Sequence, residues 1–515
     1  MSRIQDNTAA IILAAGIGSR LNPLTLEKPK SLIKVNNREI LDYQIKGYQS
    51  AGIKLKNIIV ITGYKTDMIE KFLDENYPEV TVITNEDYKT TNNMYSLYLG
   101  LRYVKNNLRN INTLIINNAD CIYSEKTMQK FINSDLKNAI AVQPGCYITE
   151  SMKISVNNEN KITDISKNLP EEESFGVSVD FYKYSDTTID ELFNIIKDFV
   201  EIKKDLNRWT EVAFPLLFLK SNVYPFDINN EKWIEIDNME DLIQADRLFS
   251  DFNLTDKKAL ICDLDGTMFI GSKPIEPAVN FIKNNSEKLD FYFLTNNTSK
   301  IPADYVEKIS STGISLTEDK ILTPLTPLIS YIKTKNYKSI YLAANKKVSE
   351  YLKQKLPDVE FEYNYDKNEA IVLTYDTEIN YEKLKNISVL INNKRLKYLA
   401  THTDVFCPTE ENNIPDIGSF IELIYKTTNK KPDIIFGKPS IRLIQGLIDK
   451  YGTEHLAIAG DRIYTDKKLA DNAGVDFICV LSGETTRTDI FHDETNAPQL
   501  ILNNLGELET SACCK

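Results

Sequence analysis

Two aspartates spaced two residues apart stand at the end of an apolar run in the segment ICDLDGTMF. Asp263 closes the run and Asp265 follows it. A carboxylate can attack a phosphorus atom covalently, which divides hydrolysis into two easier steps. A second carboxyl group can protonate the leaving oxygen and then activate water, and Mg²⁺ would screen the like charges of nucleophile and phosphate. For the bare D-x-D-G-T pattern, a calcium loop and a simple turn stay open as alternatives.

Three later segments supply groups of the kinds that such chemistry needs. FLTNNTSK offers Thr295 and Asn296, whose hydroxyl and amide can hold phosphate oxygens. FGKPS offers Lys438, which can neutralise a phosphoryl group. AGDRIYTD offers Asp461 as a metal ligand, with Asp466 behind it to orient the ligands.

The order of these four motifs resembles that of the haloacid dehalogenase superfamily of phosphatases. TNNTSK, GKPS and GDRIYTD are most similar to its p-nitrophenylphosphatase branch, whose members carry a large α/β cap between the second and third motifs. The resemblance implies an aspartyl-phosphate intermediate on Asp263, with Asp265 and Lys438 as further catalytic residues. It also implies Mg²⁺ held by Asp263, Asp265 and Asp461.

A second set of chemically suited residues lies near the start of the chain, in LAAGIGSRLNPLTLEKPK. Gly16 and Gly18 let the main chain approach a ligand closely, and backbone N–H groups in such a loop can face phosphate or base acceptors. Arg20 can bind a phosphate with two parallel hydrogen bonds, and Lys30 adds a point charge. Many strand-to-helix turns contain two glycines, so the glycine spacing alone leaves an ordinary turn open.

The whole segment resembles the signature of the nucleotidyltransferases that couple a nucleoside triphosphate to a phosphorylated small molecule and release pyrophosphate. In that family the equivalents of Arg20 and Lys30 contact the phosphates, which makes both catalytic candidates. Asp120, at the end of TLIINNAD, and Asp237, in KWIEIDN, match the family's Mg²⁺ ligands, although Asp120 alone could be a turn former or helix cap. The predicted nucleotide-binding residues are Leu13, Ala14, Ala15, Gly16, Gly18, Arg20 and Lys30.

The segment NEDYKTTNNMYSLYLGL and the EIDN ending look like the phosphocholine cytidylyltransferase branch, which implies CTP as the triphosphate. A quaternary ammonium group would need aromatic neighbours. Tyr95 and Trp209 are the substrate-binding candidates, with Phe175 and Trp233 as further ones, and all four could instead be core residues. NRWTEVAF matches the choline-specific enzymes only loosely, so another phosphorylated alcohol, a phosphopolyol or a phosphonate stays open. A sugar-1-phosphate nucleotidyltransferase is the alternative.

The elements that must position these residues can be read from the alternation of apolar runs with amphipathic stretches of helical length. AAIILAA, NIIVITG, VTVITN and NTLIINNAD are nearly continuous apolar runs, as expected for strands covered on both faces. The alternation predicts an α/β fold with two three-layer domains and mostly parallel sheets. The first would be a Rossmann-like nucleotidyltransferase domain, and the second a Rossmann-like phosphatase core with an inserted α/β cap.

The polar stretch DFNLTDKK interrupts the alternation, which then restarts, so a domain boundary is expected near residue 250. We expect the nucleotidyltransferase domain at 1–250, the phosphatase core at 255–330 and 431–510, and the cap at 331–430. Within the cap, Thr401–Asp404 and Pro415–Gly418 either touch substrate or form ordinary loops.

The composition restricts partners and compartment. With 61 Lys and Arg against 73 Asp and Glu, the formal charge is 61 − 73 = −12, which argues against non-specific nucleic-acid binding. No apolar run approaches the ~20 residues that span a bilayer, and MSRIQDNTAA lacks a signal-peptide stretch, so no membrane insertion is expected. The seven scattered cysteines indicate buried thiols in a reducing, cytoplasmic compartment. A homo-oligomer stays open.

These features predict a bifunctional enzyme that uses Mg²⁺ in both domains. One domain would transfer CMP from CTP to a small phosphorylated alcohol, polyol or phosphonate and release pyrophosphate. The other would hydrolyse a phosphomonoester. Both would serve the synthesis of a CDP-activated precursor of a surface polysaccharide or lipid. The alternative from a different class is that one half is a non-catalytic regulatory or binding module.

Overall fold

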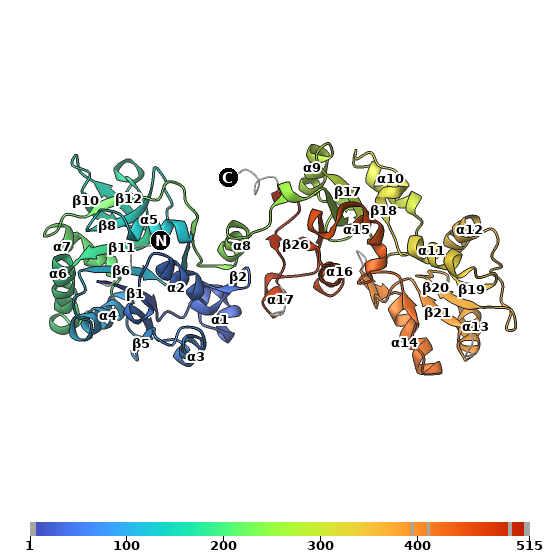
Figure 1. Ribbon diagram of the computed structural model, residues 1–515, viewed down its shortest axis with the longest axis horizontal. Coiled ribbons are helices and arrows are strands. Elements are labelled where there is room, and N and C mark those ends of the chain that lie inside the picture. The colour runs from blue at the N-terminus through green and yellow to red at the C-terminus, as the bar shows by residue number, and fades with distance from the viewer. Residues whose placement is uncertain (1–6, 393–395, 409–411, 493–496, 509–515) are drawn as a thin grey trace. The chain divides into compact units, whose positions relative to one another are not determined.

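The computed structural model of the chain describes residues 7–392, 396–408, 412–492 and 497–508. The chain divides into two compact units, Met1–Phe249 (the N-terminal unit) and Ser250–Lys515 (the C-terminal unit), as Figure 1 shows by colour. Each unit has its own sheets and its own hydrophobic clusters, so each buries its apolar surface independently.

A nine-stranded sheet forms the centre of the N-terminal unit. Its strands are β1 (Thr8–Ala14), β4 (Ile58–Thr62), β5 (Thr81–Thr84), β6 (Thr113–Asn118), β8 (Ala139–Pro144), β9 (Lys153–Val156), β10 (Ile162–Ser166), β11 (Gly176–Ser185) and β12 (Tyr224–Asp227). The order is β10-β9-β11-β6-β1-β4-β5, with β8 pairing with both β11 and β12. β6, β1, β4 and β5 run parallel, whereas β11 is antiparallel to β6.

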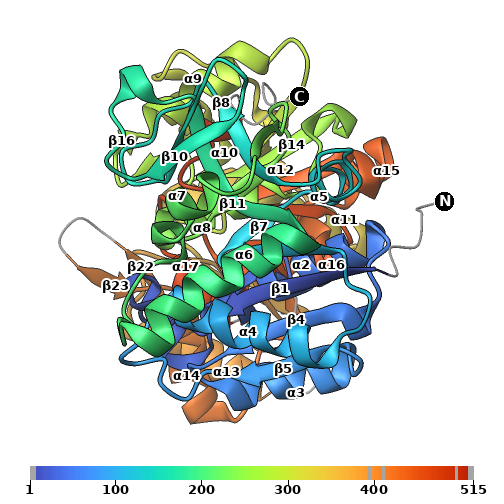
Figure 2. The ribbon, with the colours of Figure 1, turned by 90° about the vertical axis from the view of Figure 1, so that its left-hand side faces the viewer.

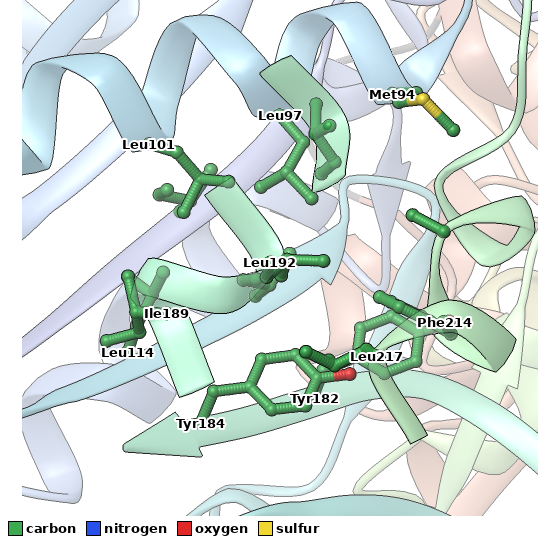
Figure 3. Close-up of a cluster of buried hydrophobic side chains, with 14 of the residues drawn as sticks. Met94, Leu97, Leu101, Leu114, Tyr182, Tyr184, Ile189, Leu192, Phe214 and Leu217 are labelled. Carbon is green, nitrogen blue, oxygen red and sulfur yellow. The ribbon is translucent and has the colours of Figure 1, made fainter. Parts of the chain in front are cut away.

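Helices cover both faces of this sheet, because side chains of a strand alternate between its faces. In β1, Ile11 and Leu13 belong to one hydrophobic cluster and Ala10 and Ile12 to the other. The first cluster contains residues of α4 (Asn93–Asn107), α6 (Asp186–Lys197) and α7 (Phe214–Phe218), which Figure 3 shows from close by. Figure 2 shows α4 and α6 on the face turned to the viewer. The second cluster contains residues of α2 (Ile40–Ser50), α3 (Thr66–Asn76) and α5 (Glu125–Ile132).

A short antiparallel ribbon joins two segments of the N-terminal unit that are far apart in sequence. It consists of β7 (Cys121–Tyr123) and β13 (Trp233–Glu235), with Glu235 opposite Cys121. α8 (Met239–Leu248) follows β13 and begins with a capping box at Asn238. The ribbon therefore carries the segment after β13 to the carboxyl end of β6.

The C-terminal unit contains a six-stranded, all-parallel sheet in the order β18-β17-β14-β25-β26-β27. Its strands are β14 (Ala259–Asp263), β17 (Asp290–Leu294), β18 (Ile321–Leu322), β25 (Leu456–Gly460), β26 (Asp476–Val480) and β27 (Leu500–Leu502). Residues of α9 (Glu276–Asn285) and α10 (Pro302–Ser310) belong to one hydrophobic cluster against it. Residues of α15 (Gln445–Tyr451), α16 (Lys468–Ala473) and α17 (Arg487–His492) belong to the other.

A second parallel sheet lies between β18 and β25 in the chain, in the order β19-β20-β21-β24. Its strands are β19 (Ile340–Ala343), β20 (Ala370–Leu373), β21 (Lys397–Ala400) and β24 (Ile434–Ile435). Its helices are α11 (Leu325–Lys335), α12 (Lys346–Lys355), α13 (Tyr381–Ile391) and α14 (Ile417–Thr428). β22 (Phe406–Pro408) and β23 (Asn413–Pro415) form a ribbon beside α14. Both units thus confirm the predicted α/β class with parallel-sheet cores, although the sheet of the N-terminal unit is mixed, because β11 pairs antiparallel with β6, β8 and β9.

Two further observations concern thiols and membranes. Cys121, Cys262 and Cys479 are buried free thiols, whereas Cys513 and Cys514 lie outside the described residues. Within the described ranges, no helix combines the length and apolarity that crossing a bilayer requires.

Candidate active sites

The first candidate site lies at the carboxyl end of β1, where a cavity of about 200 Å³ opens. Its lining contains every predicted nucleotide-binding residue except Ala15: it consists of Leu13, Ala14, Gly16, Gly18, Arg20, Lys30, Ser31, Ala119, Asp120 and Asp237. Ala15 is buried, and its carbonyl accepts a hydrogen bond from the Tyr64 N–H at 3.2 Å. The fold therefore gathers residues from three distant segments around one cavity.

The two glycines of the loop have different roles in the structure. Gly18 has φ 67°, and a Cβ atom there would lie 3.1 Å from Cβ of Lys30. A side chain at this position would therefore be strained and would press on Lys30. At Gly16 no heavy atom lies within 4 Å of the position that a Cβ would take, so this glycine leaves open space on the cavity wall.

Lys30 lies between the two aspartates predicted as metal ligands. Its Nζ is 3.0 Å from Asp120 Oδ2 and 3.0 Å from Asp237 Oδ1. Arg20 Nη2 is 2.9 Å from Asp237 Oδ2. Burial lowers the pKa of Lys30, but the two aspartates outweigh it and raise this pKa to about 12. Lys30 is therefore positively charged at neutral pH, and it lines the cavity.

A third carboxylate, which the sequence analysis did not assign, joins Asp120 and Asp237. Ligand oxygens of Asp120, Glu235 and Asp237 all lie within 4.8 Å of one another. The Ile236 N–H donates to the Asp120 carbonyl at 2.9 Å and locks the ribbon in this register. The E-I-D spacing was an available signal, because residues i and i+2 of a strand point to the same side.

Electrostatics at these three carboxylates indicates a site for a cation. Burial, followed by repulsion from Asp180, Asp120 and Asp237, raises the pKa of Glu235 to about 9. All three ligand atoms are carboxylate oxygens, the donors that Mg²⁺ prefers. The residues present therefore fit a divalent cation of this type.

A buried acidic pair beside this site also went unpredicted. The Tyr182 hydroxyl is 2.9 Å from Asp180 Oδ1 and 3.1 Å from Glu211 Oε1, and Asn118 Nδ2 donates to Asp180 Oδ2 at 3.0 Å. Burial, followed by Glu211 and Asp120, raises the pKa of Asp180 to about 7. Asp180 has φ 54°, which is rare for a non-glycine residue. A register shift in β11 places it there, and no local sequence pattern marks such a shift.

The two predicted substrate-binding aromatic residues lie in different surroundings. Tyr95 packs against the hydrophobic cluster of α4 and α6 and stacks on Tyr98, with ring centroids 6.2 Å apart. Trp209 is 48% exposed, and Lys167 Nζ lies 5.2 Å from its ring centroid. Neither lines the cavity at β1.

The second candidate site lies at the carboxyl end of β14, in the C-terminal unit. Lys438 Nζ is 2.5 Å from Asp263 Oδ1 and 2.6 Å from Asp466 Oδ1, and all three residues are buried. Burial lowers the pKa of Lys438, but Asp263 and Asp466 together raise it above its usual value. Lys438 is therefore held in its charged form against Asp263.

Asp461 completes a group of three carboxylates whose ligand oxygens lie within 4.8 Å of one another. Its Oδ2 accepts the Glu484 N–H at 2.8 Å, whereas its buried Oδ1 has no hydrogen-bond partner among the described residues. A Cβ atom on Gly266 would come within 2.3 Å of Asp461 Oδ2. Burial, followed by Asp466, raises the pKa of Asp461 to about 6. An orphaned oxygen in a buried group of like charges fits a divalent cation.

Asp265 and Thr295 stand close to this group without joining it. The Asp265 side chain is 49% exposed, and its Oδ1 is 3.3 Å from Lys308 Nζ. Thr295 is buried, and its hydroxyl oxygen accepts the Asn297 N–H at 3.1 Å. The Asp265 carboxylate is therefore half-exposed and pairs with Lys308.

Asn296 connects the second motif to the third. Its Oδ1 accepts the Lys438 N–H at 2.7 Å. Its Nδ2 donates to both carboxylate oxygens of Asp404, at 3.2 and 3.1 Å. Asn296 therefore positions the backbone of Lys438 and also fixes a residue that follows β21.

Comparison with known proteins agrees with the two sites. Residues 9–251 match the family model for nucleotidyl transferases. Residues 260–355 match that for haloacid dehalogenase-like hydrolases, and residues 435–508 match a HAD-hydrolase-like model. The chain therefore consists of a nucleotidyl transferase domain followed by a haloacid dehalogenase-like hydrolase domain, and both predicted family resemblances are confirmed.

Individual relatives cover one half of the chain or the other. An acid sugar phosphatase of Staphylococcus epidermidis is 29% identical over 45% of this chain and 90% of its own length. A CTP:phosphoglutamine cytidylyltransferase of Campylobacter jejuni is 37% identical over 26% of this chain, which spans about half (51%) of that relative. A 4-nitrophenylphosphatase of Thermotoga maritima is 32% identical in a structural match with TM-score 0.46, covering 50% of this chain and 98% of that one. The family models and the two curated relatives together show that the chain is an enzyme of the nucleotidyl transferase and phosphatase classes.

Proposed function

We propose that the N-terminal unit transfers CMP from CTP to a small phosphorylated alcohol, polyol or phosphonate and releases pyrophosphate. The C-terminal unit hydrolyses a phosphomonoester through an aspartyl-phosphate intermediate, with the second parallel sheet acting as its cap. Both reactions serve the synthesis of a CDP-activated precursor of a surface polysaccharide or lipid. The similarity to the CTP:phosphoglutamine cytidylyltransferase of Campylobacter jejuni supports CTP as the nucleotide.

The position of Lys30 carries the proposal for the N-terminal unit. Its ammonium lies 3.0 Å from both Asp120 and Asp237 at the wall of the cavity behind the glycine loop. Arg20 and Lys30 bind the phosphates and orient the α-phosphorus towards the attacking phosphate oxygen. Asp120 and Asp237, with Glu235, would hold Mg²⁺, which would supply charge neutralisation for the phosphates. Positioning and charge neutralisation are the main needs of this reaction.

The group formed by Asp263, Lys438 and Asp461 carries the proposal for the C-terminal unit. Asp263 attacks the phosphorus, and Lys438 neutralises charge on the phosphoryl group. Asp265 protonates the leaving oxygen and then activates water. Thr295 and Asn296 would bind phosphate oxygens. Asp263, Asp265 and Asp461 would hold Mg²⁺, which would supply screening between the anionic nucleophile and the phosphate.

The two activities can be separated by two isosteric substitutions in the full chain. Asp120→Asn is expected to lower CTP-dependent pyrophosphate release by at least about 100-fold and to leave orthophosphate release from p-nitrophenyl phosphate unchanged. Asp263→Asn is expected to reduce that orthophosphate release to background, because an amide cannot attack phosphorus, and to leave CTP turnover unchanged. Screening phosphorylated alcohols, polyols, sugars and phosphonates with CTP identifies the acceptor. Loss of both activities in either variant contradicts two independent sites.

A further inference from the structure

A second cavity, of about 290 Å³, adjoins the proposed nucleophile in the C-terminal unit. Its lining comes from the segment after β21, from the Lys438 motif and from the segment after β25: it consists of Thr403, Asp404, Val405, Phe406, Lys438, Pro439, Arg462, Tyr464, Thr465 and Glu484. Lys438 touches Asp263, so a phosphate ester bound at Asp263 would extend its leaving group into this space. The lining side chains would therefore contact the leaving group and determine which esters the phosphatase accepts.

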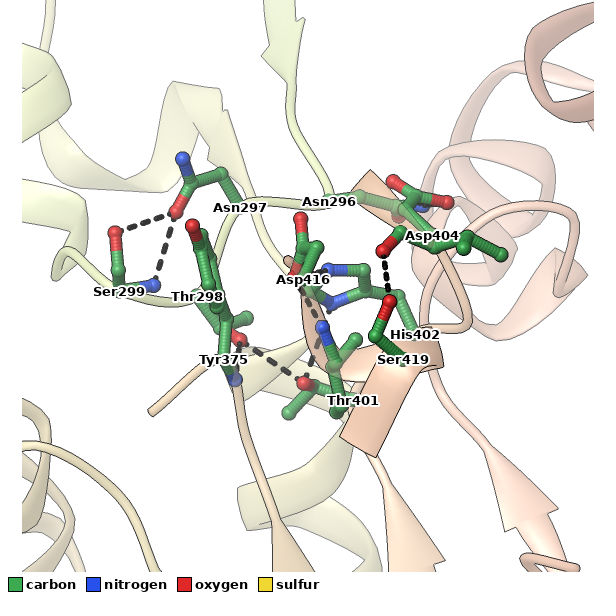
Figure 4. A network of polar contacts seen from close by, with 12 residues as sticks. Asn296, Asn297, Thr298, Ser299, Tyr375, Thr401, His402, Asp404, Asp416 and Ser419 are labelled. Carbon is green, nitrogen blue, oxygen red and sulfur yellow. Dashed lines mark hydrogen bonds and ion pairs between the residues drawn. The ribbon is translucent and has the colours of Figure 1, made fainter. Parts of the chain in front are cut away.

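Asp404 is held by several hydrogen bonds. Both of its carboxylate oxygens accept Asn296 Nδ2, at 3.2 and 3.1 Å, and its carbonyl accepts the Gly418 N–H at 2.8 Å. Ser419 Oγ donates to the carbonyl of Val405 at 2.6 Å, as Figure 4 shows. A Cβ atom on Gly418 would lie 2.4 Å from the Thr403 carbonyl, so the start of α14 packs directly under this segment. Asp404 therefore projects from a rigid support.

The charges that face the cavity leave Asp404 without a matching cation. Arg462 Nε lies 3.0 Å from Glu484 Oε2, so these two charges balance each other. Tyr464 OH donates to Glu484 at 2.9 Å. His402, whose ring lies near Asp404, makes its contact with Asp416 at 3.1 Å instead. No ion pair within the described ranges includes Asp404.

Other lining groups also lack a protein partner or present apolar surface. Thr465 is 5% exposed, and its hydroxyl oxygen has no hydrogen-bond partner in the described part of the chain. A buried hydroxyl without a partner is costly unless a ligand or water satisfies it. Phe406 and Tyr464 are 39% and 52% exposed and offer ring surface beside it. The cavity thus combines a carboxylate acceptor, an unsatisfied hydroxyl and aromatic edges.

We propose that Asp404 makes this cavity selective for an uncharged, hydroxyl-bearing leaving group, such as a polyol or sugar, and against a leaving group with a second anion. This inference rests on the proposed phosphatase function. An ionised carboxylate only accepts hydrogen bonds, so it pairs with ligand hydroxyls, and it repels a like charge placed beside it. A second anion would find no free cation among the described residues that line this cavity unless it separated Arg462 from Glu484.

Two substrates that differ at one terminal carbon test this proposal. Sorbitol 6-phosphate and 6-phosphogluconate are open six-carbon chains that end in CH₂OH and in a carboxylate, respectively. The wild-type chain is expected to prefer sorbitol 6-phosphate by about tenfold or more in kcat/KM, and Asp404→Asn is expected to reduce this preference at least about fivefold. Both rates come from one preparation, so an unfolded fraction cancels from their ratio. Asp358→Asn, an exposed change of the same charge, serves as the matched control.

The possible results separate failure of this inference from failure of the phosphatase function. Equal turnover of both substrates by the wild type, or a preference for 6-phosphogluconate, overturns the inference alone. The inference is also overturned if Asp404→Asn and the control Asp358→Asn show the same ratio of kcat/KM for the two substrates. If the wild type releases no orthophosphate from any ester, including p-nitrophenyl phosphate, the proposed function fails and the inference fails with it.

Discussion

Lys30 and Lys438 occupy the same electrostatic situation in two unrelated halves of the chain. Lys30 Nζ lies 3.0 Å from each of two aspartates, and Lys438 Nζ lies 2.5 and 2.6 Å from two others. In both cases a lysine ammonium with little exposure to solvent compensates carboxylates that would otherwise repel one another. Removing one partner of such a group leaves uncompensated charge in a poorly solvated place. We therefore propose that each lysine both stabilises its site and binds a phosphate.

Lys30→Met is the sharpest test at the scale of single residues. The thioether chain keeps much of the volume but removes the charge that faces Asp120 and Asp237. We expect CTP-dependent pyrophosphate release to fall by at least about 100-fold, measured in the full chain with the acceptor found by screening. Lys56→Met, an exposed substitution in the same unit, is the matched control and should stay close to wild type. A Lys30→Met rate within tenfold of this control would contradict the assigned role.

At the scale of elements, both sites depend on tight turns directly after central strands. Gly266 follows the Asp263 strand, has φ 90°, and would place a Cβ only 2.3 Å from Asp461 Oδ2. An L side chain there meets both backbone strain and a buried carboxylate that cannot move far. β14 and β25 are paired neighbours in the sheet, and the glycine at this turn leaves the space that Asp461 occupies beside Asp263.

Gly266→Ala should accordingly damage the phosphatase site and nothing else. Displacing a metal-binding or attacking group by about 1 Å costs on the order of 100-fold in rate, so orthophosphate release should fall by about this factor. Gly446→Ala is the control, because Gly446 lies in α15 with no heavy atom within 4 Å of its added Cβ. Alanine there should keep full activity and stabilise the helix by about 0.5–1 kcal/mol, measured by urea unfolding. Full phosphatase activity of Gly266→Ala would contradict the close packing of Gly266 against Asp461.

The sequence allowed prediction of the parts of each site that are local in the chain. Asp263 and Asp120 end apolar runs, so strand periodicity alone places them at a sheet edge. Glu235 and Asp180 went unassigned as site residues, and Asp404 was named only within a stretch that could touch substrate or form an ordinary loop. Their positions depend on a ribbon pairing, a register shift in β11 and the packing of α14, respectively. The E-I-D spacing was a signal for Glu235, whereas contacts between distant segments place Asp180 and Asp404 and leave no short pattern in the sequence.

At the scale of the whole molecule, the two units pose a chemical conflict within one chain. The N-terminal unit is proposed to consume a phosphorylated compound, whereas the C-terminal unit removes phosphate. Because the two sites are covalently linked, a phosphatase site is present wherever the transferase site is. An unselective phosphatase would therefore destroy the acceptor. The selectivity proposed for the Asp404 cavity resolves this conflict when the acceptor carries a second anionic group, because the carboxylate repels that group.

The acceptor identified with CTP should consequently be a poor substrate of the same chain's phosphatase. We expect its orthophosphate release to be at least about 100-fold slower in kcat/KM than that of the best uncharged hydroxyl-bearing ester, because a second anion on the acceptor would stay unpaired beside Asp404. Asp120→Asn removes consumption by CTP transfer from this measurement, and Asp263→Asn shows how much release comes from the C-terminal unit. Rapid hydrolysis of the acceptor by Asp120→Asn, absent in Asp263→Asn, would show that the two activities oppose each other. The proposal of a shared biosynthetic purpose would then fail, even with both active sites intact.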